Sequence, residues 1–369
     1  MKPNVDVFVV GGGPAGLVAA IAARQQGLSV MVADGADHPN DKPCGEGLIP
    51  EAQAILTSLN IHLSKDAGCR FRGIRFLQRE KKVCTKYPEG EGLGLRRTLL
   101  HEVLVAKAEE DGAELLWKTP VTGIDPVSVE LKQGRVTAKW IVGADGSGSR
   151  VRRWSGLAEE SGRRQRFAAR RHYRVPPWSE YIEIYWGECR QVYVTPVATD
   201  EVCIVILAES VEDTKFAKSL ENWPELQDRL AGAEMVTRER GAITSMQTLK
   251  NVYRGNVALV GDASGSVDAI TGEGLRLAFQ QGLELAEAMK CSDLSRYQSA
   301  HRRLMRRPTW MGELMLLMGR NAVVRERTMQ SLAARPQLFQ QLLSIHVGAS
   351  STRRMIGAGA RLGWEFLAA

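Results

Sequence analysis

The sequence predicts an α/β fold: a parallel β-sheet covered by helices, interrupted by a second, β-rich domain and followed by a helical C-terminal region. Three observations predict it. A strand–helix–strand unit with a glycine-rich turn opens the chain, a strand-rich stretch with many aromatic residues fills residues 167–206, and a buried strand with its own glycine turn follows at 257–265. Alternating strands and helices are typical of a parallel sheet. Because the glycine turns lie on both sides of the β-rich stretch, we expect the two domains to be interleaved along the chain.

The opening unit occupies about thirty residues, as a βαβ motif does. Residues 6–10 form a short apolar run typical of a buried parallel strand. An alanine-rich helix is predicted at 17–26, and a second apolar strand at 28–33 ends at Asp34. The turn at 11–16 therefore lies between a strand and a helix, where a dinucleotide-binding loop belongs.

The glycines of this turn have the G-x-G-x-x-G spacing. Gly11 permits the tight turn, Gly13 lets the backbone approach a pyrophosphate, and Gly16 lets the helix pack on the strand. Pro14 and Ala15 complete the loop. Free amides at the start of the helix face the phosphates, and the helix dipole favours their negative charge.

Asp34 stands about 20 positions after the glycine loop, as the acidic residue of a dinucleotide site does. We expect its carboxylate to accept hydrogen bonds from the hydroxyls of the adenosine ribose. The same charge would repel a 2′-phosphate. The first site therefore suits FAD or NAD better than NADP.

Three motifs follow one another in order: Gly11-x-Gly13-x-x-Gly16, Gly143-Ala144-Asp145-Gly146, and Gly261-Asp262-Ala263 leading to Gly272-Glu273-Gly274. Together they resemble the glutathione-reductase-type flavoproteins, in the branch of p-hydroxybenzoate-hydroxylase-like monooxygenases, flavin-dependent halogenases and geranylgeranyl reductases. The resemblance covers residues 4–300. It implies an FAD-binding Rossmann-like domain with an interleaved β-sheet substrate domain, and FAD as the cofactor.

The resemblance also implies roles for single residues. Asp262 would hold the ribityl chain of FAD, and Gly272 and Gly274 would bring backbone amides against the flavin ring. Asp145 would support FAD and the approach of a reduced nicotinamide. The residues expected to bind FAD are Gly11, Gly13, Pro14, Ala15, Gly16, Asp34, Cys44, Gly45, Arg97, Asp145, Gly261, Asp262, Gly272, Glu273 and Gly274.

Within this branch the geranylgeranyl reductases look most similar. Residues 42–47 read Lys-Pro-Cys-Gly-Glu-Gly, similar to their P-C-G-G-type segment. Ala269 stands where their pattern usually has proline, which predicts a less rigid loop at the flavin ring. Cys44 and Glu46 are the catalytic candidates. Cys44 would contact the substrate or donate a proton, or else only pack in the loop; Glu46 would bind the ribityl chain or act as an acid.

Arginines provide further candidates for contacts with phosphates. Arg97 precedes an amphipathic helix predicted at 98–111, and the resemblance suggests an arginine there that reaches the FAD phosphates; Arg96 competes for this role. Arg150, Arg152 and Arg153 follow the second motif. They would attract a nicotinamide dinucleotide, or else lie on the surface of a helix start. No second complete nucleotide fold is recognisable, so NADH or NADPH would bind transiently.

Domain boundaries follow from these motifs. We predict an FAD-binding domain at residues 1–70, 98–165 and 251–300, a β-rich substrate domain at 71–97 and 166–250, and a helical C-terminal region at 301–369, broken at Pro308 and Pro336.

Charge is concentrated at the C-terminal end. The net charge is +7, and residues 301–369 carry eleven arginines, three glutamates and no lysine. A tail of this charge is typical of segments that bind nucleic acid, an acidic membrane surface or an anionic substrate. The alternative is a solvated face of a helix. No nucleic-acid motif accompanies it, so no nucleic-acid partner is expected. We expect these helices either to form a lid or to contact a membrane surface. Alternatively, residues 310–318 simply pack on the core.

Composition restricts the setting of the protein. No apolar run reaches the ~20 residues of a membrane span, and a strand with a glycine loop opens the chain, so no signal peptide is expected. The six cysteines show no C-x-x-C pair and no zinc-ligand spacing, which predicts free thiols and no metal site. We expect a cytoplasmic protein, with the oligomeric state open.

Two enzyme hypotheses and one alternative remain. The first is a monooxygenase-like FAD-dependent oxidoreductase that acts on a hydrophobic or aromatic small molecule, with a reduced nicotinamide or another reductant as donor. The second is a geranylgeranyl-reductase-like enzyme that reduces double bonds of an isoprenoid or lipid. The third is a non-catalytic binding protein on the flavoprotein fold. A halogenase is disfavoured because the W-x-W-x-I-P signature is absent.

Overall fold

A parallel sheet near the N-terminus forms the centre of the first half of the molecule. The computed structural model describes residues 4–64, 66–158 and 165–349. In this sheet β1 pairs in parallel with β2 and β11, β2 with β8, and β11 with β19. Across the sheet the order is β18 (Tyr253–Arg254), β19 (Val257–Leu259), β11 (Gly134–Gly143), β1 (Val5–Val10), β2 (Val30–Ala33) and β8 (Glu114–Leu116).

Helices and a small antiparallel extension cover this sheet. Helix α1 packs between α3 and α7, and its alanines let the helices approach closely. The helices of this half are α1 (Pro14–Gln25), α2 (Pro50–Ser58), α3 (Arg97–Glu110), α4 (Arg150–Trp154) and α7 (Gly274–Lys290). Strands β9 (Val121–Ile124) and β10 (Ser128–Leu131) continue β11 as an antiparallel ribbon. The predicted α/β class with its Rossmann-like unit is confirmed.

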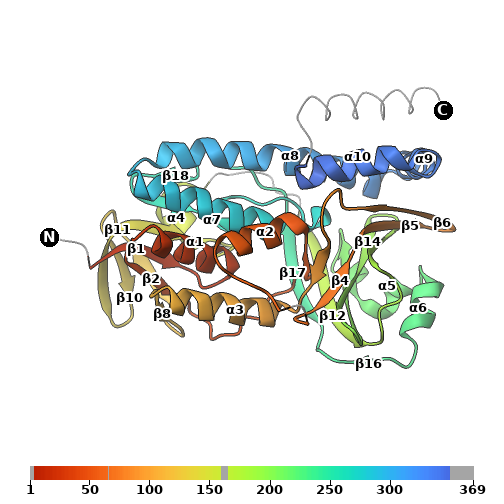
Figure 1. Cartoon of the computed structure of the whole chain (residues 1–369), viewed down its shortest axis with the longest axis horizontal. Coiled ribbons are helices and arrows are strands. Elements are labelled where there is room, and N and C mark those ends of the chain that lie inside the picture. Colours follow the sequence, from red (N-terminus) through yellow and green to blue (C-terminus); the bar gives the residue numbers. More distant parts are fainter. Residues whose placement is uncertain (1–3, 65, 159–164, 350–369) are drawn as a thin grey trace.

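The second sheet lies beside the first along the longest axis of the molecule (Figure 1). Its neighbours are antiparallel except β5 and β13, which run parallel. The order is β16 (Glu234–Met235), β12 (Gln165–Arg174), β15 (Glu201–Ala208), β14 (Arg190–Ala198), β13 (Tyr181–Trp186), β5 (Gly73–Gln78) and β6 (Lys81–Lys86), with β17 (Arg240–Ser245) also on β12. Its strands thus come from residues 73–86 and 165–245.

Each face of the second sheet has its own cover. On one face lie the 3₁₀ turn η1 (Glu212–Thr214) and the short helices α5 (Phe216–Leu220) and α6 (Pro224–Leu230), whose apolar side chains pack with Tyr185 and Val192. A three-stranded sheet of β3 (Gly47–Leu48), β7 (Gly92–Gly94) and β4 (Cys69–Phe71) joins the two halves.

The C-terminal helices cover the other face of the second sheet, except that the first part of the longest one packs on the first half of the molecule. They are α8 (Leu294–Arg320), α9 (Ala322–Ala334) and α10 (Pro336–Val347). Met311, Met315 and Met318 share a core with Trp186 and Tyr193. Residues 310–318 therefore pack on the core. The remaining part of the predicted region, 350–369, lies outside the described residues.

The prediction that the C-terminal helix breaks at Pro308 is wrong. Helix α8 runs through Pro308, although proline removes one backbone hydrogen bond and costs about 3 kcal/mol in a helix interior. Buried Met305 precedes it by one turn and buried Met311 follows it by one turn. Packing of the turns on either side outweighs the lost bond. Pro336, in contrast, begins a new helix, where proline is well tolerated.

His301 on α8 makes the stability of the fold depend on pH. Its side chain is buried, and its Nε2 lies 3.0 Å from the Ser264 hydroxyl oxygen. Burial lowers the pKa of His301 from 6.5 to about 4. Between these values the unfolded chain binds a proton that the folded chain does not, so stability falls as the pH drops from 6.5 towards 4. At 1.36 kcal/mol per pKa unit the loss is ~3 kcal/mol.

We therefore expect His301→Gln to lose less stability on acidification than the unmodified protein. Urea unfolding of each protein at pH 7 and at pH 4.5 measures the two losses of stability. The difference between the two proteins isolates His301 from the other groups that titrate in this range. Equal losses for both proteins would contradict the assignment.

Within the described residues, no helix is both long and apolar enough to cross a bilayer.

Candidate functional site

A cavity of about 780 Å³ opens where the two sheets meet. Its size is in the range of cofactor and ligand sites. The carboxyl ends of β1, β2 and β11 form one side, and the second sheet forms the other. All of the predicted site residues line this cavity except Gly16 and Glu273.

The glycine loop makes one wall of the cavity. Gly11 has a φ of +112°, and a Cβ there would lie 2.5 Å from the Ala144 carbonyl oxygen. A Cβ on Gly16 would lie 1.9 Å from the Gly11 carbonyl oxygen, so the absence of a side chain lets α1 meet β1. A Cβ on Gly13 would have no neighbour within 4 Å among the described atoms. Gly13 therefore borders open space, where a phosphate can approach the backbone.

Asp34 and a histidine hold this loop in place. The amides of Gly12 and Ala36 donate to the two carboxylate oxygens of Asp34, at 2.7 and 2.8 Å. His101 on α3 has its Nε2 2.7 Å from the Gly12 carbonyl oxygen. Because a carbonyl only accepts, this nitrogen carries the hydrogen. Burial lowers the pKa of His101, which favours the neutral ring that this geometry needs.

Arg97 is available for an anion. Its side chain is buried at the start of α3 and lines the cavity. Its Nε has no hydrogen-bond partner, and none of the described carboxylates forms an ion pair with its guanidinium. Its neighbour Arg96 instead pairs with Glu201. A buried guanidinium without a partner is costly, and a pyrophosphate would satisfy it. Of the two candidates, Arg97 therefore fits the FAD phosphates.

We expect Arg97→Gln to weaken FAD binding by about ten- to a hundredfold, since hydrogen bonds to charged groups contribute ~1.5–3 kcal/mol. Titration of the apoprotein with FAD, followed by flavin fluorescence, measures the affinity. Arg96→Gln is the control, and we expect it to bind FAD like the unmodified protein. If Arg96→Gln loses FAD while Arg97→Gln retains it, the roles are reversed.

The second motif caps a short helix beside the cavity. The Asp145 carboxylate accepts from the Ser149 hydroxyl and from the amides of Arg150 and Val151. Arg152 is buried, and its guanidinium donates to the carbonyl oxygens of Ser147 and Ala263. The expectation that Arg152 lies on the surface is therefore wrong, because its buried guanidinium joins this helix to the third motif. Its role in attracting a nicotinamide stays a prediction.

The third motif supplies an exposed carboxylate and a second helix start. The carboxylate of Asp262 has no partner within the part of the chain that is described, and it lines the cavity. Gly272 and Gly274 leave open space where a Cβ would stand, and α7 begins at Gly274 without a side-chain cap. The Glu273 side chain is buried away from the cavity and pairs with Arg276 at 2.6 Å.

Side chains brace the loop before Gly272, where the resembling pattern has proline. Asp268 accepts from the Ile270 amide and pairs with buried Arg166 at 2.8 Å. The Tyr193 hydroxyl donates to the Ile270 carbonyl oxygen at 2.7 Å. The backbone of this loop, which includes the turn η3 (Ala269–Thr271), is thus held from two strands of the second sheet. The lower rigidity predicted from Ala269 is offset by these contacts.

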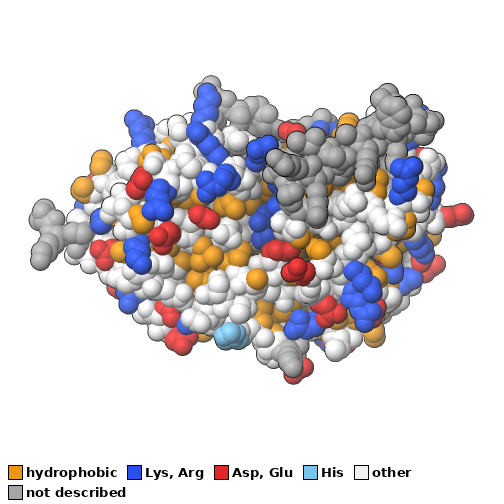
Figure 2. Space-filling model, turned by 45° about the horizontal axis from the view of Figure 1, so that its top comes forward, with side chains coloured by type: hydrophobic (Ala, Val, Ile, Leu, Met, Phe, Trp, Pro, Cys, Tyr) orange, Lys and Arg blue, Asp and Glu red, His pale blue; other side chains and the backbone are white. Residues whose placement is uncertain are grey.

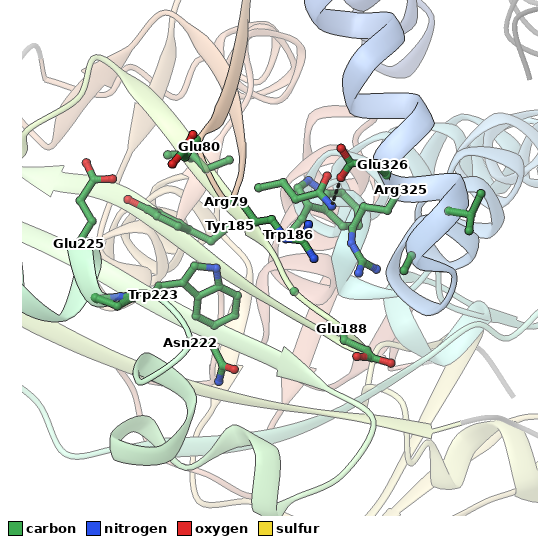
Figure 3. A pocket seen from close by; sticks show the side chains of 16 residues that line it. Arg79, Glu80, Tyr185, Trp186, Glu188, Asn222, Trp223, Glu225, Arg325 and Glu326 are labelled. Carbon is green, nitrogen blue, oxygen red and sulfur yellow. Dashed lines mark hydrogen bonds between the residues drawn. The ribbon is translucent and has the colours of Figure 1, made fainter. Parts of the chain in front are cut away.

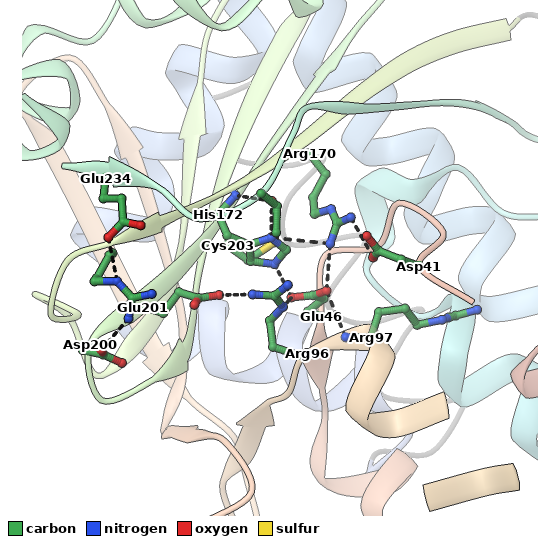
Figure 4. A network of polar contacts seen from close by, with 12 residues as sticks. Asp41, Glu46, Arg96, Arg97, Arg170, His172, Asp200, Glu201, Cys203 and Glu234 are labelled. Atoms are coloured by element: carbon green, nitrogen blue, oxygen red, sulfur yellow. Dashed lines mark hydrogen bonds and ion pairs between the residues drawn. The ribbon is translucent and has the colours of Figure 1, made fainter. Parts of the chain in front are cut away.

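Glu46 joins the loop at 42–47 to both halves of the molecule (Figure 4). Its φ is +58°, and its side chain is fully buried. One carboxylate oxygen accepts from the Arg97 amide at 2.9 Å and from Arg170 at 3.2 Å. The other lies 2.6 Å from His172 Nε2. With both oxygens engaged, Glu46 is held as a positioning residue, while Cys44, whose thiol accepts from the Glu46 amide at 3.3 Å, faces the cavity.

The same network includes a set of atoms of the kind that bind metals. Glu46, His172 and Cys203 each offer a ligand atom, and these atoms lie within 4.8 Å of one another. The guanidinium of Arg170 lies on the same carboxylate, and that of Arg96 is 4.0 Å away. These positive charges oppose a cation, so the set does not favour metal binding.

A second cavity, of about 850 Å³, lies between β5, β13, α6 and α9 (Figure 3). Trp186, Trp223 and Arg325 are among the residues that line it. None of the predicted site residues does. The chemistry predicted from the motifs therefore belongs to the first cavity.

The geometry of the first cavity fits FAD: two helix starts without a side-chain cap surround one space, together with a buried arginine and a carboxylate that have no ion-pair partner among the residues that the structure describes. A family model described as "FAD binding domain" matches residues 4–292. The chain belongs to this family. This FAD-binding protein is an FAD-dependent oxidoreductase of the superfamily that its motifs resemble, and FAD is its cofactor.

Several curated relatives of the FAD-binding protein are reductases. A menaquinone reductase of Mycolicibacterium smegmatis is 27% identical over 328 residues, which cover 81% of this chain and 80% of the relative. A digeranylgeranylglycerophospholipid reductase of Methanococcus vannielii is 25% identical over 314 residues, covering 78% and 77%. These matches support an enzyme.

Solved structures share the fold. The flavin-dependent brominase Bmp2 superposes with a TM-score of 0.83 at 20% identity, covering 98% of this chain and 99% of the other. A geranylgeranyl bacteriochlorophyll reductase-like protein from Thermoplasma acidophilum gives a TM-score of 0.76 at 21% identity, covering 96% and 95%. The predicted combination of an FAD-binding domain, a β-sheet domain and a helical C-terminal region is confirmed as a fold.

Sequence reasoning missed several residues that shape the FAD site. His101 braces the glycine loop, His172 and Arg170 hold Glu46, and His346 on α10 lines the cavity. The one signal for His101 in the sequence was its position three residues after the predicted start of the helix at 98–111. The others lie far along the chain from their partners and have no local motif.

Proposed function

We propose that this FAD-dependent oxidoreductase reduces carbon–carbon double bonds in the isoprenoid chain of a lipid. The observation that carries the proposal is the pair of reductase relatives whose similarity extends over about four fifths of both chains. Their names identify a menaquinone and a geranylgeranylated phospholipid, and both molecules carry isoprenoid chains. Among the sequence hypotheses, this favours the double-bond reductase over the hydroxylase.

The walls of the cavity support an apolar substrate. The second sheet contributes mainly aliphatic side chains to it, and burial of such surface favours hydrocarbon by roughly 25 cal/mol per Å². The apolar lining residues from this sheet are Ile74, Ala168, Ile182, Ile184, Val205 and Leu207.

Bound FAD, when reduced, supplies a hydride to one carbon of the double bond. The protein has to fix the ring and provide a proton for the other carbon. The uncapped start of α7 and the open backbone at Gly272 and Gly274 offer amides to the ring. Cys44 faces the cavity as one candidate proton donor. A reduced nicotinamide is the proposed electron donor, binding transiently.

An anaerobic reaction tests this function. The FAD-loaded protein is incubated with a menaquinone or a geranylgeranylated phospholipid and excess dithionite or NADPH, and the product is analysed by mass spectrometry. After air reoxidation of any quinol formed by the reductant, we expect a gain of two hydrogen atoms in the isoprenoid chain for each reduced bond, formed without oxygen. A product that forms only with oxygen and carries an added oxygen atom would instead establish the hydroxylase.

Stopped-flow absorbance separates the possible donors. NADH and NADPH are each mixed with the oxidised protein, with and without the lipid, and bleaching of the flavin band is followed. Reduction by one nicotinamide at a useful rate supports transient binding. Reduction by dithionite alone would direct the search to another electron-donor protein.

The proposal includes contact with a membrane surface, where such lipids reside. Figure 2 shows Lys and Arg side chains on the face that carries α8. Arg302, Arg303 and Arg306 are exposed on this helix, and Leu317 near its end is 50% exposed. Each cation near an anionic surface contributes about 1 kcal/mol. Co-sedimentation with vesicles of anionic phospholipid, but not with neutral vesicles, is expected, and replacing the three arginines by glutamine should abolish it.

A further inference from the structure

Two alanines stand side by side on the face of the second sheet that borders the first cavity. Ala168 on β12 and Ala242 on β17 are opposite each other in the strand register, and both line the cavity. We call them the alanine pair, and they are the smallest side chains that this sheet contributes to the cavity. Residues of two loops also line it: the Cys44 loop (42–47) and the flavin-ring loop (268–272), which leads to the amides offered to the ring.

Arginines on either side of Ala168 hold these two loops against the sheet. Side chains two residues apart on a strand point to the same face, so Arg166 and Arg170 share the face of Ala168. Arg166 pairs with Asp268 in the flavin-ring loop at 2.8 Å. Arg170 pairs at 2.8 Å with Asp41, which directly precedes the Cys44 loop (Figure 4). Ala168 therefore lies between the points at which the two loops are attached.

The neighbouring strand β17 repeats this arrangement around Ala242. In the register, Thr244 stands opposite the first of the two arginines and Arg240 stands opposite the second. The Thr244 hydroxyl oxygen accepts a hydrogen bond from the Ala269 amide of the flavin-ring loop at 2.9 Å. Arg240 pairs with Asp41 at 2.8 Å. On both strands the polar side chains thus hold the loops, and the alanine pair between them is the part of these strands that an apolar ligand can approach.

The cavity continues from the alanine pair along the second sheet in one direction and towards solvent in the other. From β17 the strands follow in the order β12, β15, β14, β13 and β5, and Ile74 on β5 lines the cavity. At a strand spacing of about 4.8 Å, this wall is roughly 24 Å long. β17 lies at an edge of the sheet, where Ile243 lines the cavity and is 55% exposed. This shape suits an elongated apolar molecule that enters across β17.

We propose that the alanine pair determines which substrates reach the flavin ring, because it leaves a passage between the two loops that fits a flexible isoprenoid chain. This inference rests on the proposed function. The chain lies against the aliphatic wall and crosses the alanine pair, while its head group stays at the β17 edge. Selection therefore acts on the chain and not on the head group. In an apolar pocket one methylene more or less changes selection by about 10–200-fold, so side chains larger than alanine here would narrow the passage measurably.

Larger side chains at Ala168 test the passage. We expect kcat/KM with the isoprenoid lipid to fall about tenfold in Ala168→Val and about a hundredfold in Ala168→Leu, since a substrate displaced by ~1 Å can lose about 10²-fold in rate. The FAD content and the urea unfolding of both variants should stay close to those of the unmodified protein, because the added atoms extend into the cavity. Ala231→Leu, the same change at an exposed alanine of the same half of the molecule, is the control and should turn over the lipid like the unmodified protein.

A binding measurement needs no turnover. A long saturated isoprenoid alcohol, which has no double bond to reduce, is titrated into the oxidised, FAD-loaded protein while the flavin absorbance is followed. We expect the unmodified protein and Ala231→Leu to bind this alcohol, and Ala168→Leu to bind it at least about tenfold more weakly. Ala242→Leu, at the partly exposed member of the alanine pair, should weaken binding as well. Together with Ala168→Val it decides the question if Ala168→Leu does not fold.

The outcomes separate the two proposals. If the unmodified protein reduces the lipid and the variants at Ala168 and Ala242 do so with the same kcat/KM, the passage is overturned and the proposed function stands. If the unmodified protein reduces no isoprenoid lipid but binds the saturated alcohol, and Ala168→Leu weakens that binding, the proposed function fails and the passage stands. If the alcohol does not bind, or binds equally to the unmodified protein and to these variants, the passage is overturned.

Discussion

Gly16→Ala is expected to destabilise the protein by more than about 3 kcal/mol and to abolish FAD binding. The new Cβ would lie 1.9 Å from the Gly11 carbonyl oxygen, which is backbone and belongs to the turn after β1. A flexible side chain can move aside, but this oxygen cannot move without pulling α1 away from the sheet. Overpacking usually costs ~1–3 kcal/mol, and a backbone clash at the centre of the sheet exceeds that range. Urea unfolding and the flavin content of the purified protein measure both effects.

Gly13→Ala is the matched comparison, three residues earlier in the same loop. Its Cβ would meet nothing within 4 Å in the described structure, and its φ of −74° suits alanine. We expect unfolding like that of the unmodified protein but an FAD affinity lower by at least about tenfold, because a methyl group occupies the space through which a phosphate approaches. A Gly16→Ala protein that is yellow and stable, or a Gly13→Ala protein that binds FAD normally, would contradict the assignment of the two glycines.

The phosphate loop and its surroundings were predictable because each part lies in one short stretch of sequence. The order strand, Gly11–Gly16 turn, helix and Asp34 needs only neighbouring residues, and the structure places β1, α1 and β2 around them. Arg97 and the third motif were found because a family pattern marks their positions. All of these motifs depend on backbone geometry close to the ligand, which restricts residue choice locally.

The side chains that support these motifs could not be predicted. His172 is 126 residues from Glu46, and Arg166 is 102 residues from Asp268. Such pairs depend on how the two sheets meet, and no local pattern distinguishes a buried arginine on a strand from an exposed one. The C-terminal region shows the same limit. Its arginines predicted a charged face. Arg307 instead pairs with Glu273, just before α7, and Arg325 donates to the Met318 carbonyl oxygen near the end of α8.

Pro308 shows a local rule that tertiary packing overrides. Proline favours a helix break because it lacks the amide hydrogen. In α8 the turns on both sides are fixed by buried methionines, so the helix continues. The sequence contains both the proline and the methionines on either side of it, and only the structure shows that the packing of the methionines outweighs the missing hydrogen bond.

Glu46→Gln is expected to destabilise the protein by about 3 kcal/mol. The change keeps the shape of the side chain but removes its charge, while the side chains of Arg170 and His172, both fully buried, remain in contact. Removing one partner of a buried ion pair typically costs ~3–5 kcal/mol, because the other charge stays out of water. Asp41 still pairs with Arg170 at 2.8 Å, which places the expected loss at the lower end of that range. Urea unfolding at pH 7 measures it.

The same substitution should also lower the affinity for FAD, because Glu46 accepts the backbone amide of Arg97 and so fixes the start of α3 beside the cavity. Asp200→Asn, which removes an ion pair between exposed side chains, is the control, and we expect it to change neither stability nor FAD affinity measurably. If Glu46→Gln keeps full stability and FAD affinity but loses turnover, Glu46 acts chemically and not as a positioning residue. A loss of stability and affinity together would show that this one buried carboxylate holds the Cys44 loop, α3 and the second sheet in the arrangement that FAD requires.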